Sequence, residues 1–385
     1  MGNTAVVVGG GIGGLAAAIG LRRIGWEVTV VERAPTLQDA GAGISLAANG
    51  LRALDELGVG EAVREASRGQ YSGGTRTPQG GWLTRMDGTA LEKAVGTPIM
   101  GIPRSTLHRL LRAPLRAEAL LIGSEVCSVE RVGPGTARVD CGDRTLDADL
   151  VVAADGIGSK VRGRLFPDHP GPVYSGSTVL RGITEKAVGL RTDFELTWGH
   201  GAEFGHIAFN DGRAEWHAVL DLPARTRFAD PPAELRRRFR DWHDPIPALL
   251  DATRPEDVLH HDVHELRTPL PSYTVGRTAL LGDAAHAMTP NLGQGACQAL
   301  EDAVTLAAAL AAEPTVEAGL ARYDAERRPR SQAVARAARQ AGRMGQRLSH
   351  PVAVALRNTA MRLTPSRLAT RMILRHHAWV PPQLG

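Results

Sequence analysis

Short, wholly apolar segments alternate along the chain with longer segments whose apolar residues recur every three or four positions. Val6–Val8 and Val28–Val31 are apolar throughout, as strands are when both faces of a parallel sheet are covered. Between them, Leu15, Ala18 and Leu21 have the spacing of one helix face. The pattern therefore predicts a strand–helix–strand unit at the N-terminus, which is typical of α/β folds.

The same criteria predict further elements along the chain. Leucines at burial spacing indicate helices at Asn49–Leu57 and Arg104–Leu115, and the pattern from Gly295 onward is mostly helical. Residues 72–95 are rich in Gly and Thr and favour irregular β structure. Apolar runs bounded by turn residues predict strands at Leu120–Val126, Ser128–Val132, Thr136–Cys141, Leu150–Ala154 and Thr278–Leu281.

Between about 176 and 266 the chain changes to short alternating segments, which favour a separate β-rich part. The strongest hairpin there joins Glu203–Phe209 to Arg213–Asp221. Asp211 and Gly212 suit a two-residue turn, which pairs Asn210 with Arg213. A three-residue loop is the alternative, and it shifts the pairing by one residue.

The register of this hairpin decides which side chains share a face. The two-residue turn makes His206 and His217 direct cross-strand neighbours, with Phe204 and Val219 on the same face. The three-residue loop instead places His206 on the face of Trp216. We prefer the first register because it separates polar from apolar side chains better.

The first strand runs directly into a glycine-rich turn. Gly9, Gly11 and Gly14 have the G-x-G-x-x-G spacing, and Glu32 ends the second strand. One glycine makes the tight turn, one lets the backbone approach a pyrophosphate, and one lets the helix pack closely on the strand. An acidic residue at this distance can hold a ribose hydroxyl. The context of strand, turn, helix and acid predicts a dinucleotide site.

A second ligand-binding pattern lies in Leu281–Ala303, LGDAAHAMTPNLGQGACQALEDA. Asp283 follows the end of a predicted strand, where its carboxylate can accept hydrogen bonds from sugar hydroxyls. The loop Pro290–Gly295 brings backbone N–H groups to a helix N-terminus, which favours anionic or electron-rich ligand atoms. Such a segment suits a nucleotide-bearing cofactor that also carries a polyol chain.

Three motifs in this order, GGGIGG…ER, ADGIGSKVR and LGDAAHAMTPNLGQGACQALEDA, cover nearly the whole chain. The chain resembles the group A aromatic hydroxylases, the single-component FAD-dependent monooxygenases. Within that family, its length and the motif WGHGAEFGHIAFNDGRAEW are most similar to the urate-hydroxylase and zeaxanthin-epoxidase-like branch.

The resemblance implies an α/β fold that is α+β overall: a Rossmann-like FAD-binding domain of the glutathione-reductase type, with an inserted β-sheet substrate domain and C-terminal helices. The implied FAD-binding domain is discontinuous and comprises residues 1–71, 96–175 and 267–330. The substrate domain comprises residues 72–95 and 176–266. Residues 331–385 form the C-terminal helical segment.

The resemblance also implies which residues hold the adenosine half of FAD and the nicotinamide. The pyrophosphate lies at the N-terminal glycines, and Glu32 holds the adenosine ribose with Arg33 beside it. The backbone of Val126 meets the adenine. Asp155 and Gly156 belong to a motif linked with both FAD and NAD(P)H. The implied cofactor-binding glycines are Gly9, Gly11, Gly13 and Gly14, of which Gly9, Gly11 and Gly14 cradle the pyrophosphate.

At the flavin half, the resemblance implies that Arg104 lies near the flavin and that Asp283 meets the ribityl hydroxyls. Pro290 and the residues that follow it line the isoalloxazine: Gly293, Gln294, Gly295, Ala296 and Cys297. NADH or NADPH reduces the flavin as a transient reductant. The reduced flavin then forms a C4a-hydroperoxide with O2, which inserts one oxygen atom into an aromatic, heteroaromatic or polyene small molecule.

Two other activities remain open on the sequence. One is a flavin oxidase or cyclising enzyme without oxygen transfer. The other is a non-catalytic flavin-binding redox protein. The urate-oxidising members have an arginine near the start of the first hairpin strand, where this chain has Glu203-Phe204, so urate is a doubtful substrate.

Histidines in the hairpin are the candidates for chemistry on the substrate. His206 and His217, together with Pro290 of the flavin loop, are candidate catalytic residues, because a histidine pKa near neutrality suits proton transfer from a phenol. Phe204, Trp216 and the same two histidines are candidate substrate-binding residues. Packed or solvated strand residues are the simpler interpretation of both histidines.

Composition narrows the class of protein further. The net charge of +4 comes with no basic stretch interleaved with aromatics, so we expect no nucleic-acid partner. The three cysteines have no metal-ligand spacing, and neither they nor the histidine pairs predict a metal site. We expect the pair His260-His261 to lie in a loop. With no basic leader before the first strand, we expect a cytoplasmic enzyme that acts on a small molecule and O2, as a monomer or homodimer.

The C-terminal segment Pro351–Trp379 is amphipathic and basic. We expect its helices to pack on the rest of the protein. Contact with a lipid surface or a second subunit is the alternative.

Overall fold

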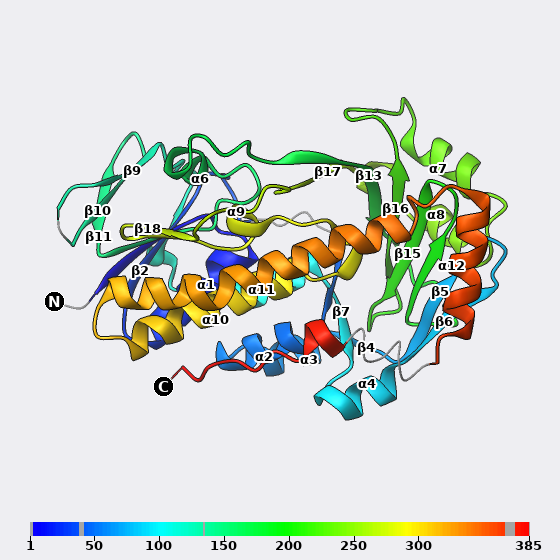
Figure 1. Cartoon of the computed structure of the whole chain (residues 1–385), viewed down its shortest axis with the longest axis horizontal. Coiled ribbons are helices and arrows are strands. Elements are labelled where there is room, and N and C mark those ends of the chain that lie inside the picture. Colours follow the sequence, from blue (N-terminus) through cyan, green and yellow to red (C-terminus); the bar gives the residue numbers. More distant parts are fainter. Residues whose placement is uncertain (1–2, 38–41, 134, 366–373, 385) are drawn as a thin grey trace.

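The computed structural model describes residues 3–37, 42–133, 135–365 and 374–384. Figure 1 shows an elongated molecule with a parallel sheet and its helices at one end and a larger, mostly antiparallel sheet at the other. The long helix α11 (Val316–Met344) runs across both. This mixed α/β architecture agrees with the predicted fold class.

The sheet at the N-terminal end has six strands, and all except β18 run parallel. Val7, Val30 and Val152 are at most 1% exposed, which confirms that both faces of these strands are covered. The strand order is β18 (Thr274–Val275), β19 (Thr278–Leu280), β12 (Leu150–Ala153), β1 (Thr4–Val8), β2 (Glu27–Glu32) and β8 (Leu120–Ile122).

Helices pack on this sheet and on one another. Helix α1 (Ile12–Arg23) packs against α10 (Gly295–Ala312), and α10 packs in turn against α11. The predicted strand Leu120–Val126 is shorter than expected, because Gly123 turns the chain with a φ of 73° and donates its N–H to the Ala34 carbonyl oxygen. The shorter helices and turns are α2 (Ala48–Glu56), α3 (Gly60–Glu65), α5 (Arg104–Arg112), α6 (Lys160–Leu165), α9 (Asp283–His286), η1 (Ala117–Ala119), η2 (Pro255–Asp257) and η3 (Pro290–Leu292).

Two small antiparallel sheets flank the parallel one. The first contains β11 (Thr145–Ala148), β10 (Ala137–Asp140) and β9 (Ser128–Arg131). The second contains β3 (Gly43–Leu46), β7 (Ile99–Pro103) and β4 (Arg68–Gln70), and it lies against strands of the large sheet.

The large sheet has seven strands drawn from two distant stretches of the chain. Their order is β17 (Leu259–Glu265), β13 (Val173–Ile183), β16 (Ala214–Asp221), β15 (Ala202–Ala208), β14 (Phe194–Trp198), β5 (Ser72–Arg76) and β6 (Trp82–Asp87). One face packs on helices α7 (Pro231–Phe239) and α8 (Ile246–Asp251). The exact limits of the three predicted domains stay a prediction.

Two local predictions in this region are wrong. His260 and His261, expected in a loop, lie within β17. Residues 72–95 are not irregular throughout, because β6 is followed by helix α4 (Gly88–Val95). Asp87 caps this helix by accepting a hydrogen bond from the Ala90 N–H at 2.9 Å, which is the N-cap role that favours Asp at helix starts.

The preferred register of the hairpin β15–β16 is also wrong, and the three-residue loop is correct. The Phe209 N–H donates to the Arg213 carbonyl oxygen at 2.9 Å, and Gly212 closes the loop with a φ of 81°. A glycine in the left-handed conformation at the end of a three-residue loop is a common hairpin closure. His206 therefore pairs with Trp216, and His217 pairs with Gly205.

A one-residue shift of register moves each side chain to the other face of the sheet. His206 is 1% exposed on the side of α7 and α8, and its Nε2 lies 3.4 Å from the Thr192 carbonyl oxygen. Burial lowers the pKa of His206 to about 4, although the hydrogen bond to Thr192 acts to raise it. His217 lies on the opposite face.

The buried His206 should make stability depend on pH. Its pKa is lower in the folded than in the unfolded state, so its contribution is present above about pH 6.5 and is lost as the pH falls toward about 4. In His206→Gln, the loss of unfolding free energy between these pH values should be smaller than in the wild type. Urea titrations at several pH values measure it, and equal losses in both proteins would contradict the assignment.

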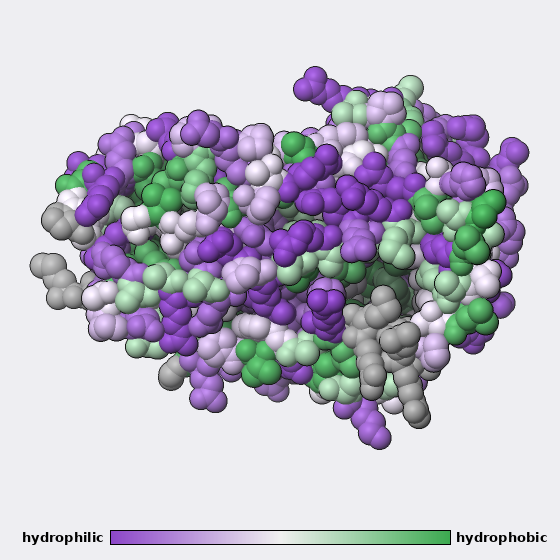
Figure 2. Space-filling view, viewed as in Figure 1, coloured by the Kyte–Doolittle hydropathy of each residue, from purple (hydrophilic) through white to green (hydrophobic). Residues whose placement is uncertain are grey.

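At the C-terminus, α12 (Pro351–Leu363) packs against β6 at the far edge of the large sheet. Hydrophobic side chains gather at this edge in Figure 2, and Val352, Leu356 and Leu363 are exposed. Residues 366–373 of the predicted amphipathic segment lie outside the described residues. Within the described part of the chain, no helix has the length and apolarity required to cross a bilayer.

Candidate functional site

The glycine turn between β1 and α1 has the geometry that a pyrophosphate site needs. Gly9 has a φ of 107°, and a Cβ on Gly14 would lie 1.9 Å from the Gly9 carbonyl oxygen. A Cβ on Gly13 would approach Ala299 of α10 to 3.3 Å. These glycines allow close packing. Around Gly11, by contrast, a Cβ would meet no described atom within 4 Å, so the turn has open space there.

Glu32 is held at the edge of this turn. Its carboxylate accepts the Gly10 N–H at 2.7 Å and the Ala34 N–H at 2.8 Å. The chain after β8 is fixed beside it, because the Ser124 N–H donates to the Glu32 carbonyl oxygen at 2.9 Å. Val126, predicted to meet adenine, follows in this segment and is buried, whereas Arg33 is exposed. A nucleotide at the turn would therefore meet both segments.

Arg162 joins the two later motifs. Its guanidinium donates to the carbonyl oxygens of Ile157 at 2.6 Å and Ala284 at 3.1 Å, and it is 4% exposed. Burial lowers the pKa of this arginine, although the negative charges of Asp155 and Asp283 act to raise it. Asp155 is itself fixed by the Ser159 hydroxyl at 2.6 Å. Arg162 thus connects the motif at Asp155 to the segment that begins at Asp283.

The predicted flavin loop combines open space with buried polar atoms that lack partners. Gly293 has a φ of 61°, and a Cβ on Gly293 or Gly295 would meet no described atom within 4 Å. Asn49 donates to the Gln294 side-chain oxygen at 2.9 Å, but Asn49 Oδ1 and Gln294 Nε2 are buried without a hydrogen-bond partner among the described residues. Such orphaned atoms fit a polar ligand lying on the loop.

Other predicted residues of the loop have distinct surroundings. Pro290 and Asp283 are exposed, and Ala296 is half-buried. The Cys297 side chain points to α2, where a Cβ on Gly50 would lie 2.8 Å from its Sγ. Burial raises the pKa of Cys297 to about 12, so its thiol packs against α2 and does not act as a nucleophile at neutral pH.

Arg104, which was also predicted to lie near the flavin, is the first residue of α5, and its backbone N–H donates a hydrogen bond to the Ala42 carbonyl oxygen.

A buried charge network beneath the loop was not anticipated from the sequence. Arg327 of α11 donates to Glu301 and, at 2.7 Å, to Asp302, both in α10. Asp302 also lies 2.6 Å from His286 Nε2 and accepts the Gly282 N–H at 2.9 Å. The network therefore ties α10 and α11 to the segment that carries Asp283. Its sequence signal was the adjacent acids Glu301-Asp302 within an otherwise Ala- and Leu-rich helix.

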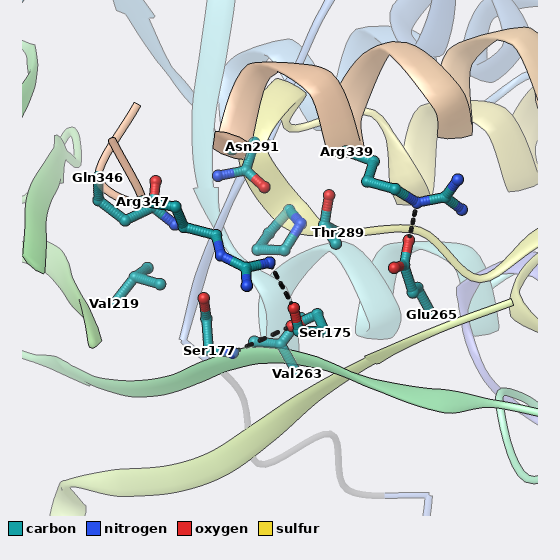
Figure 3. A pocket seen from close by; sticks show the side chains of 12 residues that line it. Ser175, Ser177, Val219, Val263, Glu265, Thr289, Asn291, Arg339, Gln346 and Arg347 are labelled. Atoms are coloured by element: carbon teal, nitrogen blue, oxygen red, sulfur yellow. Dashed lines mark hydrogen bonds and ion pairs between the residues drawn. The ribbon is translucent and has the colours of Figure 1, made fainter. Parts of the chain in front are cut away.

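Figure 3 shows a pocket where the loop meets the large sheet. Its empty space of about 350 Å³ includes volume open to solvent. Its charged side chains are largely paired: Arg339 with Glu265 at 2.6 Å, and Arg347 with the Ser175 carbonyl oxygen at 2.6 Å. The loop contributes Thr289, Pro290 and Asn291, and the sheet contributes Ser175, Ser177, Val219, Val263 and Glu265. The face of β16 that bears Val219 is thus turned toward the loop.

Of the four predicted substrate-binding residues, only His217 lies on this inner face. Phe204 and Trp216 stack on each other at 5.7 Å between ring centroids in the core under α7 and α8, and His206 lies on that same side. The inner face instead presents two buried acids that we did not single out, Glu203 and Glu215. The predicted register put Glu203 on the opposite face from His217, whereas Glu215 shares the face of His217 in either register.

The residues present therefore fit FAD. The glycine turn has open space, Glu32 is fixed beside it, and the loop offers unpartnered amide atoms, which are features that a dinucleotide with a polar ring requires. Among the described residues, no group of His, Cys, Asp and Glu is arranged to hold a metal ion.

Comparison with known proteins supports this interpretation. Residues 3–338 match the family model described as an FAD binding domain. The chain is 39% identical over 348 residues to aurachin C monooxygenase/isomerase from Stigmatella aurantiaca, covering 90% of each protein. It is 34% identical to 3-amino-4-hydroxybenzoate 2-monooxygenase from Streptomyces cremeus, covering 86% of this chain and 85% of that one.

A solved structure has nearly the same fold along the whole chain. It is HpxO from Klebsiella pneumoniae, complexed with FAD and uric acid, with a TM-score of 0.91 and 26% identity over 100% of this chain and 98% of that one. The family match and the relatives, taken with the geometry of the glycine turn and the loop, lead to one conclusion: this chain belongs to the family of FAD-dependent monooxygenases and hydroxylases and binds FAD.

Proposed function

We propose that this enzyme uses NADH or NADPH to reduce its FAD and then inserts one atom of O2 into an aromatic, heteroaromatic or polyene small molecule. The observation that supports this proposal is the pocket in which the loop at Pro290 faces the large sheet. The names of the relatives, which include oxygenases of aminohydroxybenzoate and of aurachin C, also favour an aromatic substrate.

In this proposal the chain's own residues bind and orient the cofactor. The open turn at Gly11 receives the pyrophosphate, and Glu32 holds a ribose hydroxyl. Asp283 accepts hydrogen bonds from the ribityl chain, and the backbone of Gly293–Ala296, with Asn49 and Gln294, meets the ring edge. The positive end of α10 favours negative charge at that edge. The bound FAD supplies the redox chemistry with O2; the protein supplies position and a dry pocket.

The test is a pair of measurements on the FAD-loaded enzyme. Anaerobic mixing with NADH and with NADPH measures flavin reduction, and mixing the reduced enzyme with ¹⁸O₂ and an aromatic ligand set measures oxygen incorporation. We expect reduction by at least one nicotinamide and one ¹⁸O atom in the product. Peroxide without labelled product would support the oxidase alternative, and no reduction by either nicotinamide would support the non-catalytic one.

A further inference from the structure

The inner face of the large sheet carries a cluster of ionisable side chains, in which Glu203 and Glu215 are buried and Arg181 and His217 are partly exposed. His217 of β16 faces Arg181 on β13 and Gly205 on β15 as cross-strand partners. Val219, two residues along the same strand, lines the pocket beside Pro290. Because residues i and i+2 of a strand share a face, His217 lies on the face of the sheet that Val219 presents to the pocket.

Glu215 fixes the orientation of this imidazole. Its Oε2 lies 3.3 Å from His217 Nδ1, and its side chain is 3% exposed, against 21% for His217. Glu215 is itself confined by β3, since a Cβ on Gly43 would lie 2.7 Å from the Glu215 Cβ. A carboxylate at Nδ1 keeps a proton on that nitrogen and leaves Nε2 as the atom that exchanges protons.

Gly205 gives the ring its place. A Cβ on residue 205 would lie 2.4 Å from His217 Nε2, so any residue other than glycine there would displace the imidazole ring. The ring therefore lies across the sheet above β15, and its Nε2 has no hydrogen-bond partner among the described residues. An imidazole that is oriented at one nitrogen and unpartnered at the other has the arrangement of a general base.

The charges around the ring come from all the strands that flank it. Glu215 and Glu203 carry carboxyl groups on the same face, whereas Arg181 beside it and His206 on the far face oppose protonation. Burial lowers the pKa of His217, but the charge and hydrogen bond of Glu215, helped by Glu203, outweigh it, so the pKa is raised. Burial also raises the pKa of Glu203, whose Oε2 accepts the Trp198 indole N–H at 2.6 Å.

We propose that His217, oriented by Glu215 and given room by Gly205, accepts a proton from a weakly acidic O–H or N–H of the substrate. This inference rests on the proposed function and selects within it: substrates are hydroxylated or N–H-bearing aromatics that are uncharged in solution, not polyenes. The substrate O–H or N–H bond breaks, the Nε2–H bond forms, and the carboxylate of Glu215 balances the imidazolium. No electrons are transferred, and the substrate anion is the more electron-rich partner for oxygen insertion. Glu215 is a positioning residue.

The direct test uses substituted phenols and hydroxyquinolines on the FAD-loaded enzyme, with 4-nitrophenol as the reporter, because its anion absorbs in the visible range. At a pH below the pKa of free 4-nitrophenol, binding to the wild type should produce the anion band. His217→Gln should bind the phenol with the band lost, and Glu215→Gln should weaken it. His261→Gln, an exposed histidine on the same face of β17, is the matched control and should behave as the wild type.

Turnover gives a second readout. For a ligand that stimulates NAD(P)H oxidation, His217→Gln should lower kcat/KM by about 10²–10⁴-fold and abolish the acid limb of its pH profile. The O-methyl ether of the same ligand should be a poor substrate for the wild type. If His217→Gln does not fold, Gly205→Ala is the second variant, because it displaces the imidazole ring but keeps the histidine, and it should also lower kcat/KM. In a separate experiment, added imidazole should restore activity to His217→Ala.

The outcomes separate this inference from the proposed function. Anion formation in His217→Gln equal to that in the wild type, no ionisation of any phenol by the wild type, or methyl ethers that serve as well as phenols would each overturn the role of His217. Oxygen incorporation from ¹⁸O₂ would still stand in those cases. Loss of oxygen incorporation with phenol ionisation intact would instead overturn the proposed function alone.

Discussion

Arg327→Met is expected to lower the unfolding free energy by about 3–5 kcal/mol, the usual cost of removing one partner from a buried ion-pair network. Arg327 is 1% exposed and contacts Glu301 and Asp302. Without it, both carboxylates remain buried, and the ion-pair partners left are Arg330 for Glu301 and His286 for Asp302. Because the network ties the Asp283 segment to α10 and α11, FAD affinity should fall as well. Urea denaturation with and without FAD measures both effects.

The matched control is Arg322→Met, on the same helix. Arg322 pairs with Glu326 at 2.8 Å, but the side chain of Arg322 is 39% exposed and that of Glu326 is 44% exposed. Exposed pairs of this kind contribute about 0–1 kcal/mol. An Arg327→Met protein no less stable than the Arg322→Met protein would show that the buried network adds nothing.

Acid should reveal the same network. Burial opposes ionisation of Asp302, but His286 and Arg327 outweigh it and lower its pKa to about 2. Since the folded-state pKa lies below the ordinary value, this stabilisation is present above about pH 4 and is lost as the pH falls toward 2. In Arg327→Met, the unfolding free energy lost between about pH 4 and pH 2 should therefore be smaller than in the wild type.

Gly11→Ala should weaken FAD binding by about 10- to 100-fold and leave the apoprotein as stable as the wild type. A Cβ at this position would meet no described atom within 4 Å, and the φ of −74° suits any residue. The added methyl group would instead occupy the space assigned to the pyrophosphate, where overpacking costs about 1–3 kcal/mol. Titration by flavin fluorescence and thermal unfolding of the apoprotein give the two values.

Gly14→Ala is the contrasting variant three residues away. Its Cβ would lie 1.9 Å from the Gly9 carbonyl oxygen, so the turn itself must move. The apoprotein should therefore be destabilised, with FAD affinity lost as a consequence. If Gly11→Ala bound FAD like the wild type, the pyrophosphate would not lie at this turn.

Several features of the fold could be predicted from residue types close together in the sequence. Val6–Val8 and Val28–Val31 form buried parallel strands because their side chains are apolar on both faces. The glycine turn follows because Gly9 and Gly14 occupy positions that a Cβ excludes. These constraints act within one turn or one strand, so the local pattern alone carries them.

The hairpin shows where local pattern fails. The segregation of polar and apolar residues favoured one register, but the loop geometry of Asn210–Gly212 selected the other. Both faces of this sheet are buried, one under α7 and α8 and the other against the second small sheet and the loop, so alternation of polarity gave a misleading criterion. The predicted register wrongly placed His206 on the face of His217 and put Glu203 on the opposite face.

The sequence by itself determined the strand–helix–strand unit, the glycine turn with Glu32, and the loop after Asp283, because each depends on residues that are neighbours in the chain. Only the tertiary structure decided which side chains share the inner face of the large sheet and that Arg327 lies against Glu301 and Asp302. Those arrangements depend on strand register and helix packing between distant segments. A change of one residue in register reverses them while leaving the sequence pattern almost equally satisfied.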